Sequence, residues 1–124
     1  MLVAYEVALD VVRELKPLVD QIKKFDRNLG VQLVDAMNST VQNLAEGAVH
    51  YGGDKRHKFS IAFGEANEVR ASLDLARAWG YVRDDSNARR VLNRLLALCW
   101  GLVNAPCGRP SISKAERAGD RAPS

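Results

Sequence analysis

The sequence predicts an all-α fold, an antiparallel up-down-up-down bundle of four helices. Apolar residues recur every three or four positions in successive segments, which is the spacing of one buried face of a helix. Only a few residues connect these segments, so each helix is expected to run antiparallel to the one before it. At 124 residues the chain is long enough to form a single domain around its own core.

The first helix is expected over residues 2–25. Its apolar seam consists of Tyr5, Ala8, Leu9, Val12, Leu15, Val19 and Ile22. Pro17 lies inside this pattern and should kink the helix, because proline lacks a backbone N–H and its ring crowds the preceding turn. The apolar stripe resumes in phase at Leu18, so the sequence predicts a kinked first helix that stays continuous.

The second helix is expected after the turn at residues 26–28, with Asp26 or Asn28 as its N-cap. Its seam consists of Leu33, Met37, Val41, Leu44 and Ala48. The run at residues 38–43 is unusually polar, although such side chains gain less inside a helix than at a cap. Two interpretations stay open: a solvated face, or a polar layer bonded to neighbouring helices or subunits.

Glycines and aspartates mark the ends of the remaining helices. Gly52 and Gly53 are expected to end the second helix, and Asp54 to cap a third that extends to about Trp79 and stops at Gly80. The seam of the third helix is Phe59, Ala62, Ala66, Val69, Leu73 and Ala76. A fourth helix is expected between the Asp-Asp-Ser run at residues 84–86 and Pro106, with a seam of Ala88, Val91 or Leu92, Leu95, Cys99 and Leu102.

Two glycines, Gly47 and Gly64, fall inside the helical patterns, where each costs about 1 kcal/mol relative to alanine. We expect both to allow close packing, because a residue without Cβ lets a neighbour approach. Several large apolar residues lie off the strict seams: Leu75, Trp79, Leu98 and Trp100. An apolar second face on a bundle is typical of oligomers, so the chain is expected to associate with itself.

The charge is uneven along the chain. Of the net charge of +3, residues 106–124 carry four basic and two acidic side chains, which leaves a net charge of only +1 for the rest. We therefore divide the chain into a bundle at residues 1–105 and a mobile polar tail at residues 106–124. No secretory signal or membrane-spanning run is evident, and two cysteines form no disulfide framework, so a cytoplasmic location is expected.

The sequence holds no recognisable catalytic centre. Glu46, His50 and His57 lie near one turn, but their spacing matches no standard metal site, so no metal and no cofactor are expected. Cys99 falls on an apolar seam, where a buried thiol is inert. Neither a nucleophile motif nor a phosphate-binding glycine loop is present. The sequence thus indicates a protein that is not an enzyme.

Two basic sets are candidates for binding nucleic acid. Lys55, Arg56 and Lys58 lie at the start of the third helix, an end that is unfavourable for cations because the helix dipole is positive there. The alternative is a solvated basic turn. The fourth helix carries the second set: Arg89, Arg90 and Arg94. Its alternative is pairing of the arginines within the helix to residues 85 and 86, or an exposed face. Any nucleic-acid contact would be mostly to the backbone.

Two blocks resemble a known family. The Asn-Leu-Ala-Glu-Gly run at residues 43–47 resembles the Asn-Ile-Ala-Glu-Gly signature of the bacterial four helix bundle proteins, first noticed as products of intervening sequences within 23S rRNA genes. Residues 59–69 are similar to the second block of that family, and the resemblance extends over residues 5–104. Departures are the lack of a basic run at residues 35–40, and Glu65 where serine is commoner.

The resemblance implies an antiparallel four-helix bundle, often assembled as a ring of five. Relatives include the accessory variability protein of diversity-generating retroelements, which binds nucleic acid and a reverse transcriptase. Six residues match the motifs of the family, and the resemblance implies structural roles for them: Asn43, Glu46, Gly47, Gly64, Asn67 and Glu68.

The resulting functional hypothesis is a non-enzymatic homo-oligomer, a pentamer by resemblance, that contacts the backbone of RNA or DNA through basic residues. Its partners would be further copies of itself, RNA or DNA, and a reverse transcriptase, with no membrane. The alternative is a protein-interaction scaffold without affinity for nucleic acid, which the near-neutral bundle favours.

Overall fold

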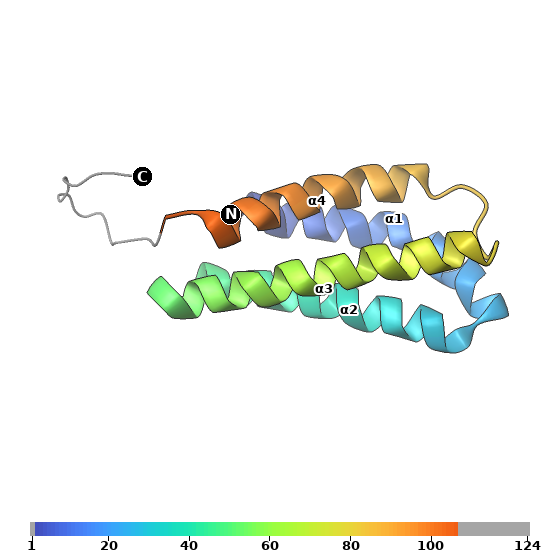
Figure 1. The fold of residues 1–124 in the computed structure, drawn as a ribbon, viewed down its shortest axis with the longest axis horizontal. Coiled ribbons are helices and arrows are strands. Elements are labelled where there is room, and N and C mark those ends of the chain that lie inside the picture. Colours follow the sequence, from blue (N-terminus) through green and yellow to red (C-terminus); the bar gives the residue numbers. More distant parts are fainter. Residues whose placement is uncertain (1, 107–124) are drawn as a thin grey trace.

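The computed structural model describes residues 2–106, which form four helices. They are α1 (Val3–Phe25), α2 (Arg27–Ala48), α3 (Gly52–Ala78) and α4 (Ser86–Asn104). The predicted all-α four-helix fold is therefore confirmed. Figure 1 shows each helix running back along the preceding one. Both α1 and α3 pack against α2 and α4, so the α1–α4 face and the α2–α3 face lie on opposite sides of the bundle. The tail predicted beyond Pro106 lies outside the described residues.

The core follows the predicted seams of α3 and α4, but that of α1 only in part. All six predicted seam residues of α3 are buried, and Cys99 and Leu92 of α4 are fully enclosed. Of the predicted α1 seam, Tyr5 and Leu9 are only half-buried and Val12 is 39% exposed, whereas Val7 and Val11, outside that seam, are buried. In α2 the predicted seam residue Ala48 is exposed. Val12 instead lines an open apolar groove between α1 and α2, together with Leu15, Val19 and Met37 among others. Within residues 2–106, no helix is long and apolar enough to cross a bilayer.

The first connection consists of one residue. Asp26 separates α1 from α2, and its Oδ1 accepts a hydrogen bond from the backbone N–H of Leu29 at 3.0 Å. Of the two predicted N-caps, Asp26 is therefore confirmed. α1 continues through Pro17 without a break, whereas the predicted kink stays a prediction.

The second connection differs from the prediction. α2 ends at Ala48, and α3 already begins at Gly52, with Tyr51 in the N-cap position. Gly52 and Gly53 therefore open α3 instead of ending α2, and Asp54 lies in the first helical turn instead of capping it. Gly52 has a φ of 58°, a left-handed conformation that glycine adopts without strain, at the point where the chain turns into α3.

The two motif glycines differ in their surroundings. A Cβ at Gly47 would come within 2.6 Å of Cε1 of the buried Phe59 ring, so the predicted close packing is confirmed there. At Gly64 a Cβ would meet nothing within 4 Å, and the residue is exposed. The expectation of close packing at Gly64 is therefore wrong for the single chain.

The α3–α4 connection starts from a helix stop. Gly80, with a φ of 78°, follows the C-cap residue Trp79, as predicted. The N–H of Tyr81 donates to the carbonyl of Ala76 at 2.8 Å, and the N–H of Gly80 donates to that of Arg77 at 3.0 Å. These two bonds form a Schellman motif, which ends α3 and fixes the position of Tyr81.

The two glycines give opposite predictions for stability. We expect Gly47→Ala to lower the free energy of unfolding by about 1–3 kcal/mol, because the added methyl group overpacks the Phe59 site. We expect Gly64→Ala to raise it by about 0.5–1 kcal/mol, because alanine restricts the unfolded chain and favours the helix. Urea unfolding followed by circular dichroism measures both values. A loss of stability at Gly64 would contradict the open space seen there.

Candidate nucleic-acid interface

The basic start of α3 has partners within the chain. The Nη2 of Arg56 donates to the carbonyl of Ala105, the C-cap of α4, at 2.8 Å. The Nζ of Lys55 lies 5.5 Å from the centre of the Phe59 ring, a cation–π distance. Because α3 runs antiparallel to α4, its positive N-terminus lies beside the negative C-terminus of α4, where a cation is favourable. The unfavourable placement inferred from the sequence is therefore compensated by a neighbouring helix end.

Lys58 ties α3 to α2. Its Nζ lies 2.7 Å from Oε1 of Glu46. The hydrogen bond from Lys58 and then its charge hold the pKa of the Glu46 carboxyl below its ordinary value. Of the six motif residues, Glu46 thus forms a polar tie between helices. The role implied for it by the resemblance agrees with this contact.

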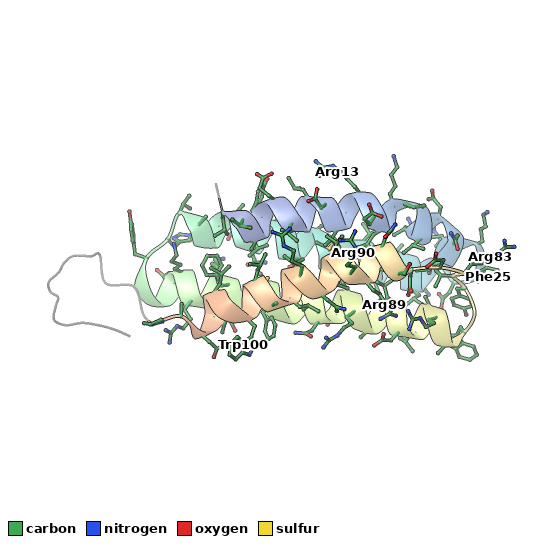
Figure 2. All side chains as sticks on the ribbon, turned by 90° about the horizontal axis from the view of Figure 1, so that it is seen from above. Arg13, Phe25, Arg83, Arg89, Arg90 and Trp100 are labelled. Carbon is green, nitrogen blue, oxygen red and sulfur yellow. The ribbon has the colours of Figure 1, made fainter. Side chains whose placement is uncertain are left out.

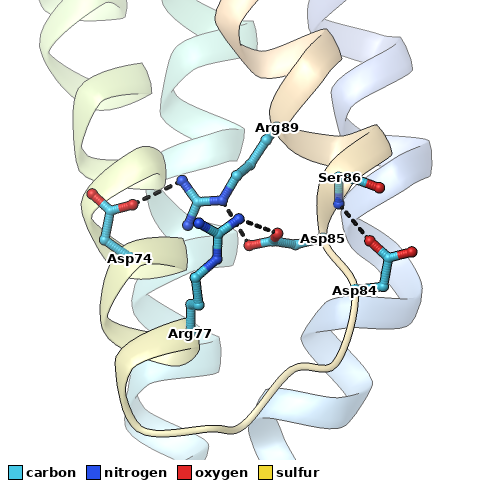
Figure 3. Close-up of polar contacts among 6 residues, drawn as sticks. All are labelled: Asp74, Arg77, Asp84, Asp85, Ser86 and Arg89. Carbon is cyan, nitrogen blue, oxygen red and sulfur yellow. Dashed lines mark hydrogen bonds and ion pairs between the residues drawn. The ribbon is translucent and has the colours of Figure 1, made fainter.

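Arg89 belongs to an ion-pair cluster at the junction of α3 and α4 (Figure 3). Its Nε lies 2.8 Å from Oδ2 of Asp85, and its Nη1 lies 2.8 Å from Oδ1 of Asp74. Arg77 completes the cluster, with its Nη2 2.7 Å from Oδ1 of Asp85. The guanidinium of Arg89 is largely enclosed, so it has little surface to offer a phosphate. This geometry corresponds to the intrahelical pairing with residue 85 that the sequence left open.

Asp85 is the centre of this cluster. Burial raises the pKa of the Asp85 carboxyl, but hydrogen bonds from Arg77 and Arg89 outweigh it and hold the pKa below its ordinary value of 3.8. The residue is at the N-cap position of α4, yet its side chain makes no capping bond. Instead, Oδ1 of Asp84 accepts a hydrogen bond from the backbone N–H of Ser86 at 3.0 Å. Sequence reasoning missed Asp74 and Arg77, since their link to α4 depends on the path of the connection.

Arg90 and Arg94 are exposed and lie one turn apart on α4. Together with Arg13 of α1 they line an open groove between α1 and α4, which we call the arginine groove. Figure 2 shows Arg13 on α1 and Arg90 on α4. Asp10 and Glu14 also line it, and Arg13 is paired with Asp10 at 2.7 Å. Among residues 2–106, neither Arg90 nor Arg94 forms an ion pair. These two guanidinium groups are therefore open to an external anion.

The opposite face is acidic. Asp35, Glu65 and Glu68 line a groove between α2 and α3, which we call the acidic groove. Leu75, half exposed, adds an apolar wall to it. Glu68, one of the six motif residues, thus lies on an exposed surface and forms no ion pair in the described part of the chain.

The other polar motif residues bond within their own helices. Asn43 donates to the carbonyl of Ser39 at 2.8 Å, and Asn67 donates to that of Phe63 at 3.0 Å. Thr40 is the buried member of the polar run in α2, and its hydroxyl donates to the carbonyl of Ala36. The run is otherwise exposed or half-buried, so it resembles the solvated face more than a layer that joins helices within one chain.

Three further side chains are of types that can bind a metal or act in catalysis: His50, His57 and Cys99. His50 and His57 are both exposed. No group of three metal-ligating side chains occurs in the part of the chain that the structure describes. Cys99 is buried, and burial raises the pKa of its thiol to about 11, so at neutral pH it stays protonated and unreactive.

The fold and the two grooves define the class of protein: a four-helix bundle with charged side chains in open surface grooves. The chain matches the model of the 23S rRNA-intervening sequence protein family over residues 1–99, and it belongs to that family. It is also similar to the crystal structure of a protein of unknown function from the S23 ribosomal protein family of Bacteroides thetaiotaomicron. The TM-score is 0.71 at 19% identity, covering 82% of this chain and 98% of that one. No curated protein matches the chain at a significant level. Neither match is described as an enzyme.

The ion-pair cluster predicts a pH-dependent contribution to stability. Replacing Asp85 by Asn should lower the free energy of unfolding at pH 7 by on the order of 3 kcal/mol, because it removes the central partner of an enclosed Arg89. The pKa of Asp85 is lower in the folded state, so this stabilisation is present above about pH 3.8 and is lost as the pH falls through the folded-state value. Urea unfolding across this pH range measures it.

Asp74→Asn is the matched control. Asp74 pairs with the same arginine but is mostly exposed, so we expect a loss below about 1 kcal/mol. Equal losses for Asp74→Asn and Asp85→Asn would contradict the central place of Asp85.

Proposed function

We propose that this chain is a non-enzymatic homo-oligomer, a ring of five by family resemblance, that contacts the backbone of RNA or DNA through the arginine groove. The exposure of Arg90 and Arg94 carries the proposal, because both guanidinium groups lack an ion-pair partner within residues 2–106. Arginine suits phosphate through its planar fork of donors. The description of the family by 23S rRNA intervening sequences is in keeping with an RNA partner.

The other predicted basic residues have weaker claims to phosphate. Arg89 is held by two carboxylates, and Lys58 by Glu46. Arg56 keeps an exposed guanidinium while it bonds Ala105, so it can join a phosphate contact at the far end of α4. We therefore place the main contact at Arg90 and Arg94 and a secondary one at Lys55 and Arg56.

The alternative is a protein scaffold without affinity for nucleic acid, and the acidic groove favours it. The arginine groove and the acidic groove lie on opposite faces and carry opposite charges. The arginine groove of one copy can therefore pair with the acidic groove of the next, and Leu75 would be covered in the same contact. In that arrangement the arginines bind another copy of the chain and not phosphate.

Charge reversal separates the two functions. We expect the double variant Arg90→Glu and Arg94→Glu to weaken binding to RNA and DNA about tenfold or more. The slope of log affinity against log salt concentration should also become less steep by about two phosphate contacts. Mobility-shift titrations at several salt concentrations measure both effects. The matched control is Lys16→Glu with Arg70→Glu, which makes the same change in net charge at exposed sites of α1 and α3.

Light scattering on the same proteins tests the alternative. A double variant that loses its oligomeric state and regains it when Glu65 and Glu68 become Lys would identify the arginines as a contact between copies. Absence of nucleic-acid binding by the unmodified chain in dilute buffer would overturn the proposed backbone contact. A single 13.7 kDa particle at high concentration would overturn the oligomer.

A further inference from the structure

Three aromatic rings stack at the end of the bundle where α1 meets the α3–α4 connection. The ring centres of Phe25 and Tyr81 are 5.2 Å apart, and the planes differ by 2°. Trp79 stacks on Tyr81 at 6.4 Å with an angle of 14°. We call these three residues the aromatic platform. The sequence alone did not reveal it, because its members come from separate segments.

The backbone holds the platform in place. Phe25 is the last residue of α1, and Asp26 ends the helix there. Tyr81 is fixed by the Schellman motif at Gly80, and its side chain packs partly against the core. The central ring is therefore anchored, and the stack does not depend on a flexible loop.

The platform contributes little to the core. Phe25 is 65% exposed and Trp79 is 69% exposed, although both are large apolar side chains. One face of each ring is engaged in the stack with Tyr81, and a planar ligand can reach the exposed remainder. Stacked, exposed aromatic rings suit an unpaired nucleobase, because every base has a π face that can continue the stack.

Three cations lie next to the platform residues in the sequence. Lys24 precedes Phe25, Arg27 begins α2, and Arg83 follows in the α3–α4 connection, all with exposed side chains. Figure 2 shows Arg83 and Phe25 at the same end of the bundle.

The carboxylates nearest in sequence are bound to the backbone. Asp26 accepts the N–H of Leu29, and Asp84 accepts the N–H of Ser86. Within residues 2–106, Lys24, Arg27 and Arg83 form no ion pair, so they can complement the phosphates on either side of a stacked base.

We propose that the aromatic platform binds an unpaired base of single-stranded RNA or DNA, while Lys24, Arg27 and Arg83 contact the adjoining phosphates. This inference rests on the proposed nucleic-acid function and extends it from the backbone to the bases. The platform discriminates single strands from duplexes, since paired bases within a duplex present no free face. The arginine groove binds both forms through phosphate alone.

Fluorescence titration of the full-length chain tests the platform. The chain has two tryptophans, so a Trp100→Phe variant leaves Trp79 as the only one. The probes are an oligothymidylate of about ten nucleotides and a DNA duplex closed by hairpins at both ends. We expect the single strand to quench Trp79, and Phe25→Ala to weaken its binding roughly 5- to 100-fold with duplex binding unchanged.

Two further variants serve as controls. Tyr51→Ala removes an aromatic ring that is 84% exposed and lies in the α2–α3 connection, so single-strand binding should not change. Phe25→Leu keeps apolar bulk without an aromatic face and should weaken binding nearly as much as Phe25→Ala. Circular dichroism of each variant verifies the fold.

The possible outcomes separate the two proposals. Unchanged single-strand affinity in Phe25→Ala, with duplex binding intact, overturns the platform and leaves the arginine groove standing. Quenching of Trp79 that persists in the Arg90 and Arg94 double variant supports the platform even if the groove contact fails. A change of oligomeric state in Phe25→Ala without a change in single-strand affinity would identify the rings as a contact between copies and overturn the platform. If the unmodified chain binds neither probe, both proposals are overturned.

Discussion

The contact between Gly47 and the Phe59 ring determines how α2 and α3 pack. Because the ring occupies the space where a Cβ at Gly47 would lie, the two helices approach closely beside the connection that joins them. Phe59 is buried there and begins the apolar seam of α3. The same approach brings Lys58 to Glu46 and leaves Lys55 over the ring. The Gly47 contact, the Lys58–Glu46 ion pair and the Lys55–Phe59 contact thus occur together beside the α2–α3 connection.

Antiparallel packing also explains why basic residues begin α3. The N-terminus of α3 lies between the C-termini of α2 and α4, and Arg56 bonds the last carbonyl of α4 directly. Considered alone, the α3 dipole disfavours cations at this position, but the two neighbouring helix ends favour them. The basic residues at the start of α3, which suggested a binding function from the sequence, thus make contacts within the fold. On α4, by contrast, Arg90 and Arg94 are exposed and form no ion pair within residues 2–106.

The sequence predicted the fold well because burial on a helix repeats with a known period, and the α3 seam is buried as expected. It predicted the stop at Gly80 and the cap at Asp26 because both are local. The predicted start of α3 was wrong, since Asp54 considered alone is a good N-cap, whereas the helix begins at Gly52. The predicted close packing at Gly64 was wrong, since a glycine in the sequence does not reveal which residue, if any, packs against it. The Arg89–Asp85 pair was among the alternatives that the sequence left open. The links of Asp74 and Arg77 to it, and the aromatic platform, could not be predicted, because each joins segments whose proximity depends on a connection.

Opposite charges on opposite faces restrict the symmetry that an assembly of these chains can adopt. A two-fold dimer through the acidic groove would bring the Asp35, Glu65 and Glu68 carboxylates of both copies together, because no cation lines that groove. The arginine groove also holds Asp10 and Glu14, so its excess of positive charge is smaller. A head-to-tail contact pairs unlike charges at every junction. Such a contact closes into a cyclic particle when the rotation between neighbours divides a full turn, and otherwise it propagates as a filament.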